Sequence, residues 1–87
     1  MSGLIAPTAP LSYRRLAMLR AVAAGRAEMT LSREPDLYVD GLPCCDQSEA
    51  RMLAHDGLIH PGQAAARGRM QARLTDAGTA LLALTPA

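Results

Sequence analysis

The chain lacks Phe and Trp, and only 2% of its residues are aromatic. Its core therefore has to be built from Leu, Ala, Met, Val and Ile, which bury less area per side chain than aromatic rings do. No apolar run approaches the ~18 residues that a membrane span requires, and the N-terminus has no basic segment followed by an apolar stretch. The two cysteines are too few for a disulfide framework. These absences lead us to expect a cytoplasmic protein with no membrane partner.

Length and composition indicate one small domain. The chain has 87 residues, of which 49% are hydrophobic, so it can bury a modest core. We expect residues 1–10 to form a flexible N-terminal lead and residues 11–87 to form a single domain.

The charge is distributed unevenly, although the net charge is only +1. Residues 1–27 contain four arginines and no acid, residues 28–49 contain six acids and one arginine, and residues 50–87 contain four arginines and two acids. All nine basic residues are Arg. This pattern predicts an acidic surface and a basic surface on the same small domain.

The first predicted helix begins after Ser12, a favourable N-cap residue, and ends at about Ala24. Gly25 follows at the position where a left-handed backbone conformation commonly closes a helix. The side chains that we expect to face the core from this helix are Leu16, Leu19, Val22 and Ala23.

The segment 27–42 changes to the two-residue alternation that is typical of β-strands. Apolar and polar residues alternate around residues 29–31 and again around residues 37–39. Turn-forming residues stand at 32–35 and at 40–41. The segment therefore predicts two short strands.

The second predicted helix covers residues 47–56. Asp46 precedes it as an N-cap, with Glu49 three residues later in a capping-box spacing, and Gly57 ends it. The side chains expected to face the core are Ala50, Leu53 and Ala54.

The last third of the chain predicts a β-hairpin over residues 58–74 that turns at Pro61-Gly62, and a final helix. Thr75 is a favourable N-cap for this helix, which continues to about Leu84. The side chains expected to face the core from it are Ala77, Leu81, Leu82 and Leu84. The predicted fold class is therefore α+β, with the element order α-β-β-α-β-β-α.

Two phrases carry a resemblance to a known family. Residues 53–59 read LAHDGLI and residues 74–78 read LTDAG, with a predicted hairpin between them. In this order and at this separation they resemble the second half of a MarR-like winged-helix domain, over about residues 48–84. The resemblance implies a small winged-helix-like, DNA-binding regulator of transcription. The family has a further helix where this sequence has the strand-like segment 27–42.

On this resemblance, helix 47–56 approaches the major groove of double-stranded DNA, and hairpin 58–74 is the wing. Arginine pairs with guanine edges and glutamine with adenine edges, and arginines also contact phosphates. The alternative is that the hairpin arginines only keep that surface solvated. The candidate DNA-binding residues are Gln47, Ser48, Arg51, His55, Arg67, Arg69 and Arg73.

A protein-interaction module is the alternative function. The acidic segment 28–42 has strand character, and an exposed strand edge can pair with a strand of another protein. The candidate partner-binding residues are Tyr38, Glu34, Asp36 and Asp40.

No set of residues indicates an enzyme or a metal site. Cys45 and His55 are ten positions apart, which corresponds to about 15 Å along a helix, too far for a nucleophile and its base. Cys44, Cys45, His55 and His60 would supply zinc ligands, but structural zinc sites favour cysteines separated by two to four residues. We therefore expect no catalytic site, no metal and no cofactor, and the sequence leaves the oligomeric state open.

Overall fold

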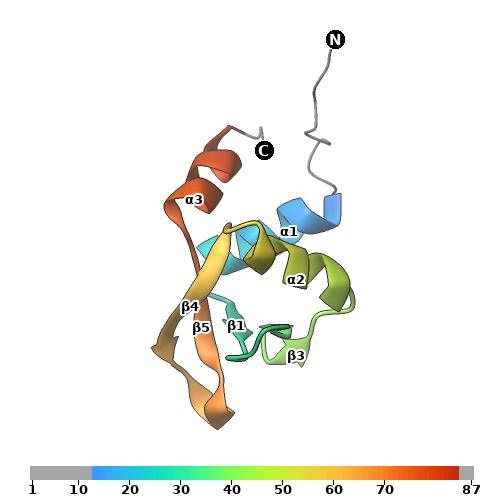
Figure 1. Cartoon of the computed structure of the whole chain (residues 1–87), viewed down its shortest axis with the longest axis vertical. Helices are drawn as coiled ribbons and strands as arrows, with labels where there is room; N and C mark the ends of the chain where they lie inside the picture. Colours follow the sequence, from blue (N-terminus) through green and yellow to red (C-terminus); the bar gives the residue numbers. More distant parts are fainter. Residues whose placement is uncertain (1–12, 85–87) are drawn as a thin grey trace.

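The computed structural model describes residues 13–84 (Figure 1). Within this range the protein has the α+β architecture that the sequence predicts, although the structure adds β3, a two-residue strand that the sequence does not predict. The predicted lead at residues 1–10 and the predicted cap Ser12 lie outside the described residues. The elements in chain order are α1 (Tyr13–Ala23), β1 (Ala27–Met29), β2 (Leu37–Val39), β3 (Leu42–Pro43), α2 (Gln47–His55), β4 (Ile59–Ala64), the 3-10 turn η1 (Ala66–Gly68), β5 (Met70–Leu74) and α3 (Asp76–Ala83).

The five strands form one antiparallel sheet in the order β3-β2-β1-β5-β4. Figure 1 shows the three helices toward one end of the molecule and the β4–β5 hairpin extending past them. Side chains alternate between the two faces of a sheet, and here the buried residues Met29, Ile59 and Ala72 share an apolar face, whereas Glu28, His60 and Arg73 share the polar face. The core side chains of the sheet and of the first two helices include Leu19, Val22, Met29, Leu37, Leu53, Ile59 and Ala72.

Helix α2 ends as the sequence predicts. Gly57 has a φ of 73°, in the left-handed region where a glycine avoids the steric cost of a Cβ. The Gly57 N–H donates to the Ala54 carbonyl at 3.1 Å, and the Leu58 N–H donates to the Leu53 carbonyl at 2.9 Å. This pair of bonds is a Schellman motif, and it turns the chain directly from α2 into β4.

The predicted turn at Pro61-Gly62 is wrong. Strand β4 continues through both residues, and the hairpin closes further on, where the Ala65 N–H donates to the Arg69 carbonyl at 2.8 Å. Proline is tolerated here because β4 is an edge strand, and the pairing with β5 shifts register between Pro61 and Ala64. The tip of the hairpin is η1, where Arg67 has a φ of 61°.

Three of the predicted core positions are also wrong. On α1, Ala23 is exposed, whereas Met18 and Ala21 are buried beside Leu19 and Val22. The sequence around this helix is apolar on several sides, so its periodicity does not fix which face is buried. On α3, Ala77 is exposed and Leu84 is 81% exposed.

None of the helices within residues 13–84 has both the length and the apolar character that are needed to cross a bilayer.

Candidate nucleic-acid interface

Gln47, which the sequence predicts to contact DNA, is instead bound to the backbone of the sheet. Its Oε1 accepts from the Leu37 N–H at 2.8 Å, and its Nε2 donates to the carbonyls of Leu37 and Cys44, both at 3.0 Å. The amide side chain therefore continues the hydrogen-bonding pattern of β2 and anchors the first turn of α2 against it. Because its donors and acceptor are engaged, Gln47 has a structural role in this arrangement.

Three acidic residues lie in α2 or directly beside its ends, and all three form ion pairs with arginines of α1. Arg14 contacts Asp46 at 2.9 Å, and Arg15 contacts Glu49 at 2.7 Å and Asp56 at 3.4 Å. These pairs remove much of the repulsion that three carboxylates on one helix would exert on a phosphate backbone.

Asp46 is also the N-cap of α2, as predicted. Its Oδ1 accepts from the backbone N–H of Glu49 at 3.2 Å and from the hydroxyl of Ser48 at 3.0 Å. The hydrogen bond from Arg14, followed by the Glu49 N–H and the Ser48 hydroxyl, holds the pKa of the Asp46 carboxyl below its usual value.

Arg51 is held by acids of the preceding loop. Its Nη2 donates to Asp36 at 2.8 Å, and its Nε lies 4.0 Å from Glu34. The Nε atom is buried and has no hydrogen-bond partner among the described residues. Arg51 therefore lies on the expected helix, but its charge is compensated and its guanidinium is only partly exposed.

Three side chains form the solvent-facing surface of α2. Ser48, Met52 and His55 are exposed at successive spacings of four and three residues, so they share one face of the helix. Of the four candidate residues on this helix, Ser48 and His55 are the two that remain accessible.

The three hairpin arginines differ in their surroundings. Arg69 donates to Glu28 at 2.9 Å and lies over the Tyr38 ring, with its Cζ 4.2 Å from the ring centroid. The Arg69 side chain is only 15% exposed, so Arg69 packs on the polar face of the sheet and helps to hold it together. Arg67 is exposed at the tip and Arg73 is exposed on β5.

Arg73 extends across the neighbouring strand over Gly62. A Cβ on Gly62 would overlap Cγ and Cδ of Arg73. His60 lies directly opposite Arg73 in the β4–β5 register, so both side chains lie on the polar face of the sheet. The Pro61-Gly62 pair, which suggests a turn in the sequence, instead makes room for this arginine.

The ion pairs leave a specific group of arginines without acidic partners. Among residues 13–84, seven ion pairs engage seven of the eight acidic residues and use five of the nine arginines, and Arg20 of α1 has an interaction of its own. Three arginines have no acidic partner within residues 13–84: Arg33, Arg67 and Arg73. All three lie on the β4–β5 hairpin or on the loop beside it, and we call them the unpaired arginines.

The candidate partner-binding residues lie in the β1–β3 region but do not form one free surface. Tyr38 is half-buried under Arg69, and Asp40 pairs with Arg26 at 3.2 Å. Glu34 and Asp36 both face Arg51. The acidic segment therefore compensates neighbouring arginines.

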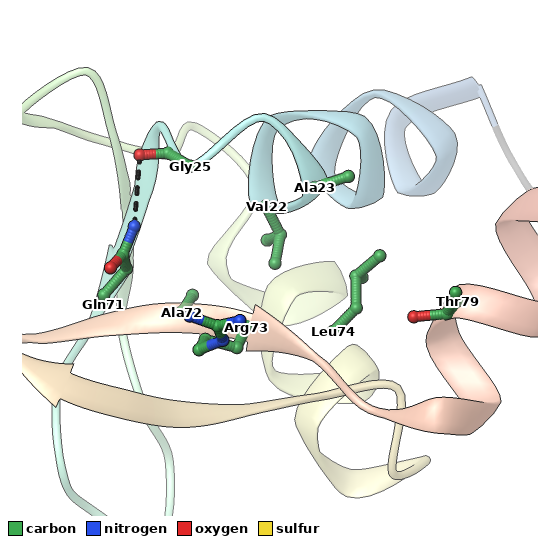
Figure 2. A pocket seen from close by; sticks show the side chains of 8 residues that line it. All are labelled: Val22, Ala23, Gly25, Gln71, Ala72, Arg73, Leu74 and Thr79. Atoms are coloured by element: carbon green, nitrogen blue, oxygen red, sulfur yellow. Dashed lines mark hydrogen bonds between the residues drawn. The ribbon is translucent and has the colours of Figure 1, made fainter.

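A hollow of about 290 Å³ lies between the end of α1, β5 and α3. Figure 2 shows Val22 and Leu74 lining its apolar part, Thr79 at one end, and Gln71 reaching the Gly25 carbonyl with a donor–acceptor distance of 3.5 Å. Its walls combine an apolar part with a few uncharged polar groups and Arg73, which do not form a recognisable catalytic set.

A second hollow, of about 320 Å³, lies between the loop 30–35, the end of α2 and β4. We call it the histidine groove, because His55 and His60 both line it. The sequence alone does not indicate this hollow, since only the tertiary fold brings the loop beside β4. The polar residues that line the groove are Thr30, Ser32, Arg33, His55 and His60.

The cysteines lie apart from these histidines. Cys44 and Cys45 are both free thiols and line a hollow beside α1, whereas the histidines line the groove at the other end of α2. No group of three or more His, Cys, Asp or Glu residues in the described part of the chain is placed to hold a metal ion.

Comparisons of this chain with protein-family models, with curated proteins and with solved structures found no match.

Proposed function

We propose that the chain is a small winged-helix-like DNA-binding protein that acts in transcription regulation. In this proposal the exposed residues of α2, Ser48 and His55, face the major groove, and the hairpin arginines Arg67 and Arg73 contact the phosphate backbone. Gln47 and Arg69 support the fold of this surface.

The distribution of uncompensated charge is the observation that carries the proposal. The unpaired arginines lie on the hairpin and the loop beside it, while the acids that border α2 are neutralised by Arg14 and Arg15. Uncompensated positive charge on the hairpin would attract the phosphate backbone of duplex DNA, although the net charge is only +1.

The backbone of Arg67 gives independent support. Its φ of 61° and ψ of 36° place it in the left-handed region, which costs an arginine about 1 kcal/mol relative to glycine. Such strain is often found where a side chain has a binding role.

An electrophoretic mobility shift with duplex DNA tests the proposal. We expect retarded DNA at about 50 mM salt and loss of the complex as the salt concentration rises, because arginine–phosphate contacts release counterions. Arg67→Gly removes the charge and relaxes the backbone, so it should weaken DNA binding while leaving the fold at least as stable. An unshifted duplex at low salt would contradict the proposal.

A second candidate, a protein-interaction module, is favoured by the edge of the sheet. Strand β3 is an edge strand, and its Leu42 is 69% exposed. Such an edge can pair with a strand of another protein. This candidate predicts that Leu42→Glu and Tyr38→Ala abolish association with a partner protein and leave DNA binding unchanged.

A further inference from the structure

Three sulfur-containing residues line the hollow beside α1, which we call the sulfur hollow. Cys44 and Cys45 lie between β3 and α2, and Met18 comes from the middle of α1, where it is 6% exposed. The hollow has a volume of about 250 Å³. Its apolar walls are completed by Ala17, Ala21 and Val39. The fold therefore gathers three sulfur residues from two separate segments of the chain at one hollow.

The backbone that carries the cysteines is held on both sides of Cys44. The Cys44 N–H donates to the Leu37 carbonyl at 2.8 Å, and the Cys44 carbonyl accepts from the Gln47 amide at 3.0 Å. Asp46, which follows Cys45, is the N-cap of α2. Cys44 is half-buried and packs against the core, whereas Cys45 is exposed. The hollow thus has one thiol fixed by its surroundings and a second that an incoming ligand can reach.

A disulfide between these two cysteines would be strained. Consecutive Cα atoms lie about 3.8 Å apart, whereas a relaxed disulfide joins Cα atoms that are roughly 4.4–6.8 Å apart. Both cysteines are free thiols. The pair is therefore better suited to hold a ligand together than to form a disulfide.

The sulfur hollow offers a metal ion sulfur and little else. Among the described residues that line it there is no histidine, and its one carboxylate, Asp46, is already engaged. The Asp46 Oδ2 accepts from Arg14. Its Oδ1 accepts from the Ser48 hydroxyl and from the Glu49 N–H. Structural zinc sites take four ligands, whereas thiolate and thioether sulfur select Cu(I).

We propose that the sulfur hollow binds one Cu(I) ion, held by the thiolates of Cys44 and Cys45 and by the thioether of Met18. On binding, each thiol releases its proton to solvent and donates an electron pair to the metal, and copper keeps its +1 oxidation state. Methionine suits the third position because its sulfur is polarisable and its side chain is adaptable. This site does not depend on the DNA-binding function proposed above.

The charge of such a centre fits the walls of the hollow. Two thiolates and one Cu(I) ion carry a single negative charge in total. Arg14 and Arg26 both line the hollow, and their ion pairs with Asp46 and Asp40 each use one guanidinium nitrogen. Because a guanidinium has five N–H donors, these arginines can also donate to the thiolates.

Competition for Cu(I) between the full chain and the chelator bicinchoninate tests the inference, in the absence of oxygen and with ascorbate as reductant. The chain should withdraw one Cu(I) ion per molecule from the coloured chelator complex. The Cys44→Ser, Cys45→Ser double variant should lower the affinity by more than about a hundredfold, since even the loss of a group behind a ligand costs about 10–100-fold. Cys45→Ser alone changes an exposed residue, so it gives the same test if the double variant does not fold.

Two conservative methionine variants test the third ligand. Met18→Leu removes the sulfur and nearly conserves the volume of the side chain, and it should lower the Cu(I) affinity about tenfold. Met29→Leu is the matched control, because Met29 is 3% exposed but lines the histidine groove, and it should leave the affinity unchanged. Equal affinities of the two variants would contradict the three-sulfur site.

X-ray absorption at the copper edge identifies the donor atoms directly. The loaded chain should show sulfur neighbours and no nitrogen or oxygen neighbours, and Met18→Leu should reduce the number of sulfur neighbours. Copper that stays with the chelator, an unchanged affinity in the double cysteine variant, or tighter binding of zinc than of Cu(I) would overturn the inference. None of these measurements involves DNA, so their outcome is separate from that of the proposed function.

Discussion

Replacing Gln47 by Ala should destabilise the protein strongly, because this side chain makes three hydrogen bonds to backbone groups of Leu37 and Cys44. Each bond contributes about 1 kcal/mol net, and a buried N–H left without a partner costs about 1–3 kcal/mol. Leu37, whose N–H would lose its acceptor, is 1% exposed. Together these contributions give a loss of about 2–4 kcal/mol, which lowers the melting temperature of a domain of this size by about 10 °C or more.

Urea unfolding followed by far-ultraviolet circular dichroism measures this loss. Gln47→Glu should be no better than Gln47→Ala, because a carboxylate oxygen would then face the carbonyls of Leu37 and Cys44. Ser48→Ala, an exposed change at the next position, should shift the stability by no more than about 0.5 kcal/mol. The structural role assigned to Gln47 is refuted if Gln47→Ala unfolds at the same urea concentration as the unmodified chain.

Three further perturbations follow from individual contacts. Gly78→Ala should cost about 1–3 kcal/mol, since its Cβ would overlap the Leu58 carbonyl, and a thermal melt checks this. Asp46→Asn should make the stability of the fold depend less on pH in the acid range. The pKa of the Asp46 carboxyl is lowered in the folded state, so ionised Asp46 stabilises the fold above the pKa of the unfolded chain. This contribution is lost as the pH falls through the pKa of the folded state. Urea midpoints between about pH 6 and pH 3 show whether the slope changes. Asp36→Asn should release Arg51 and raise the affinity for DNA about two- to fivefold at low salt, with Asp40→Asn as the matched charge control in a mobility shift.

The elements governed by local chemistry were predictable from the sequence. Asp46 and Thr75 cap α2 and α3, and Gly57 closes α2, because capping depends on residues within one or two turns. The turn at Asp40-Gly41 was predictable for the same reason, since both residues take the left-handed conformation there.

The composition of the candidate site was less predictable because it depends on long-range pairs. Arg15 and Glu49 are separated by 34 positions, and Arg69 and Glu28 by 41, so no local pattern shows that these arginines are compensated. Gln47 looked accessible from its place in the helix, but the fold brings its amide against β2.

The salt dependence of DNA affinity, measured by fluorescence anisotropy, tests the role of the unpaired arginines most directly. The Arg67→Ala, Arg73→Ala double variant should lower the slope of log affinity against log salt by about 1.8, since each lost phosphate contact contributes about 0.9. The Arg20→Ala, Arg26→Ala double variant, with the same change in charge, should retain the slope of the unmodified chain. Equal slopes for the two double variants, or no measurable DNA binding by the unmodified chain, would contradict the account.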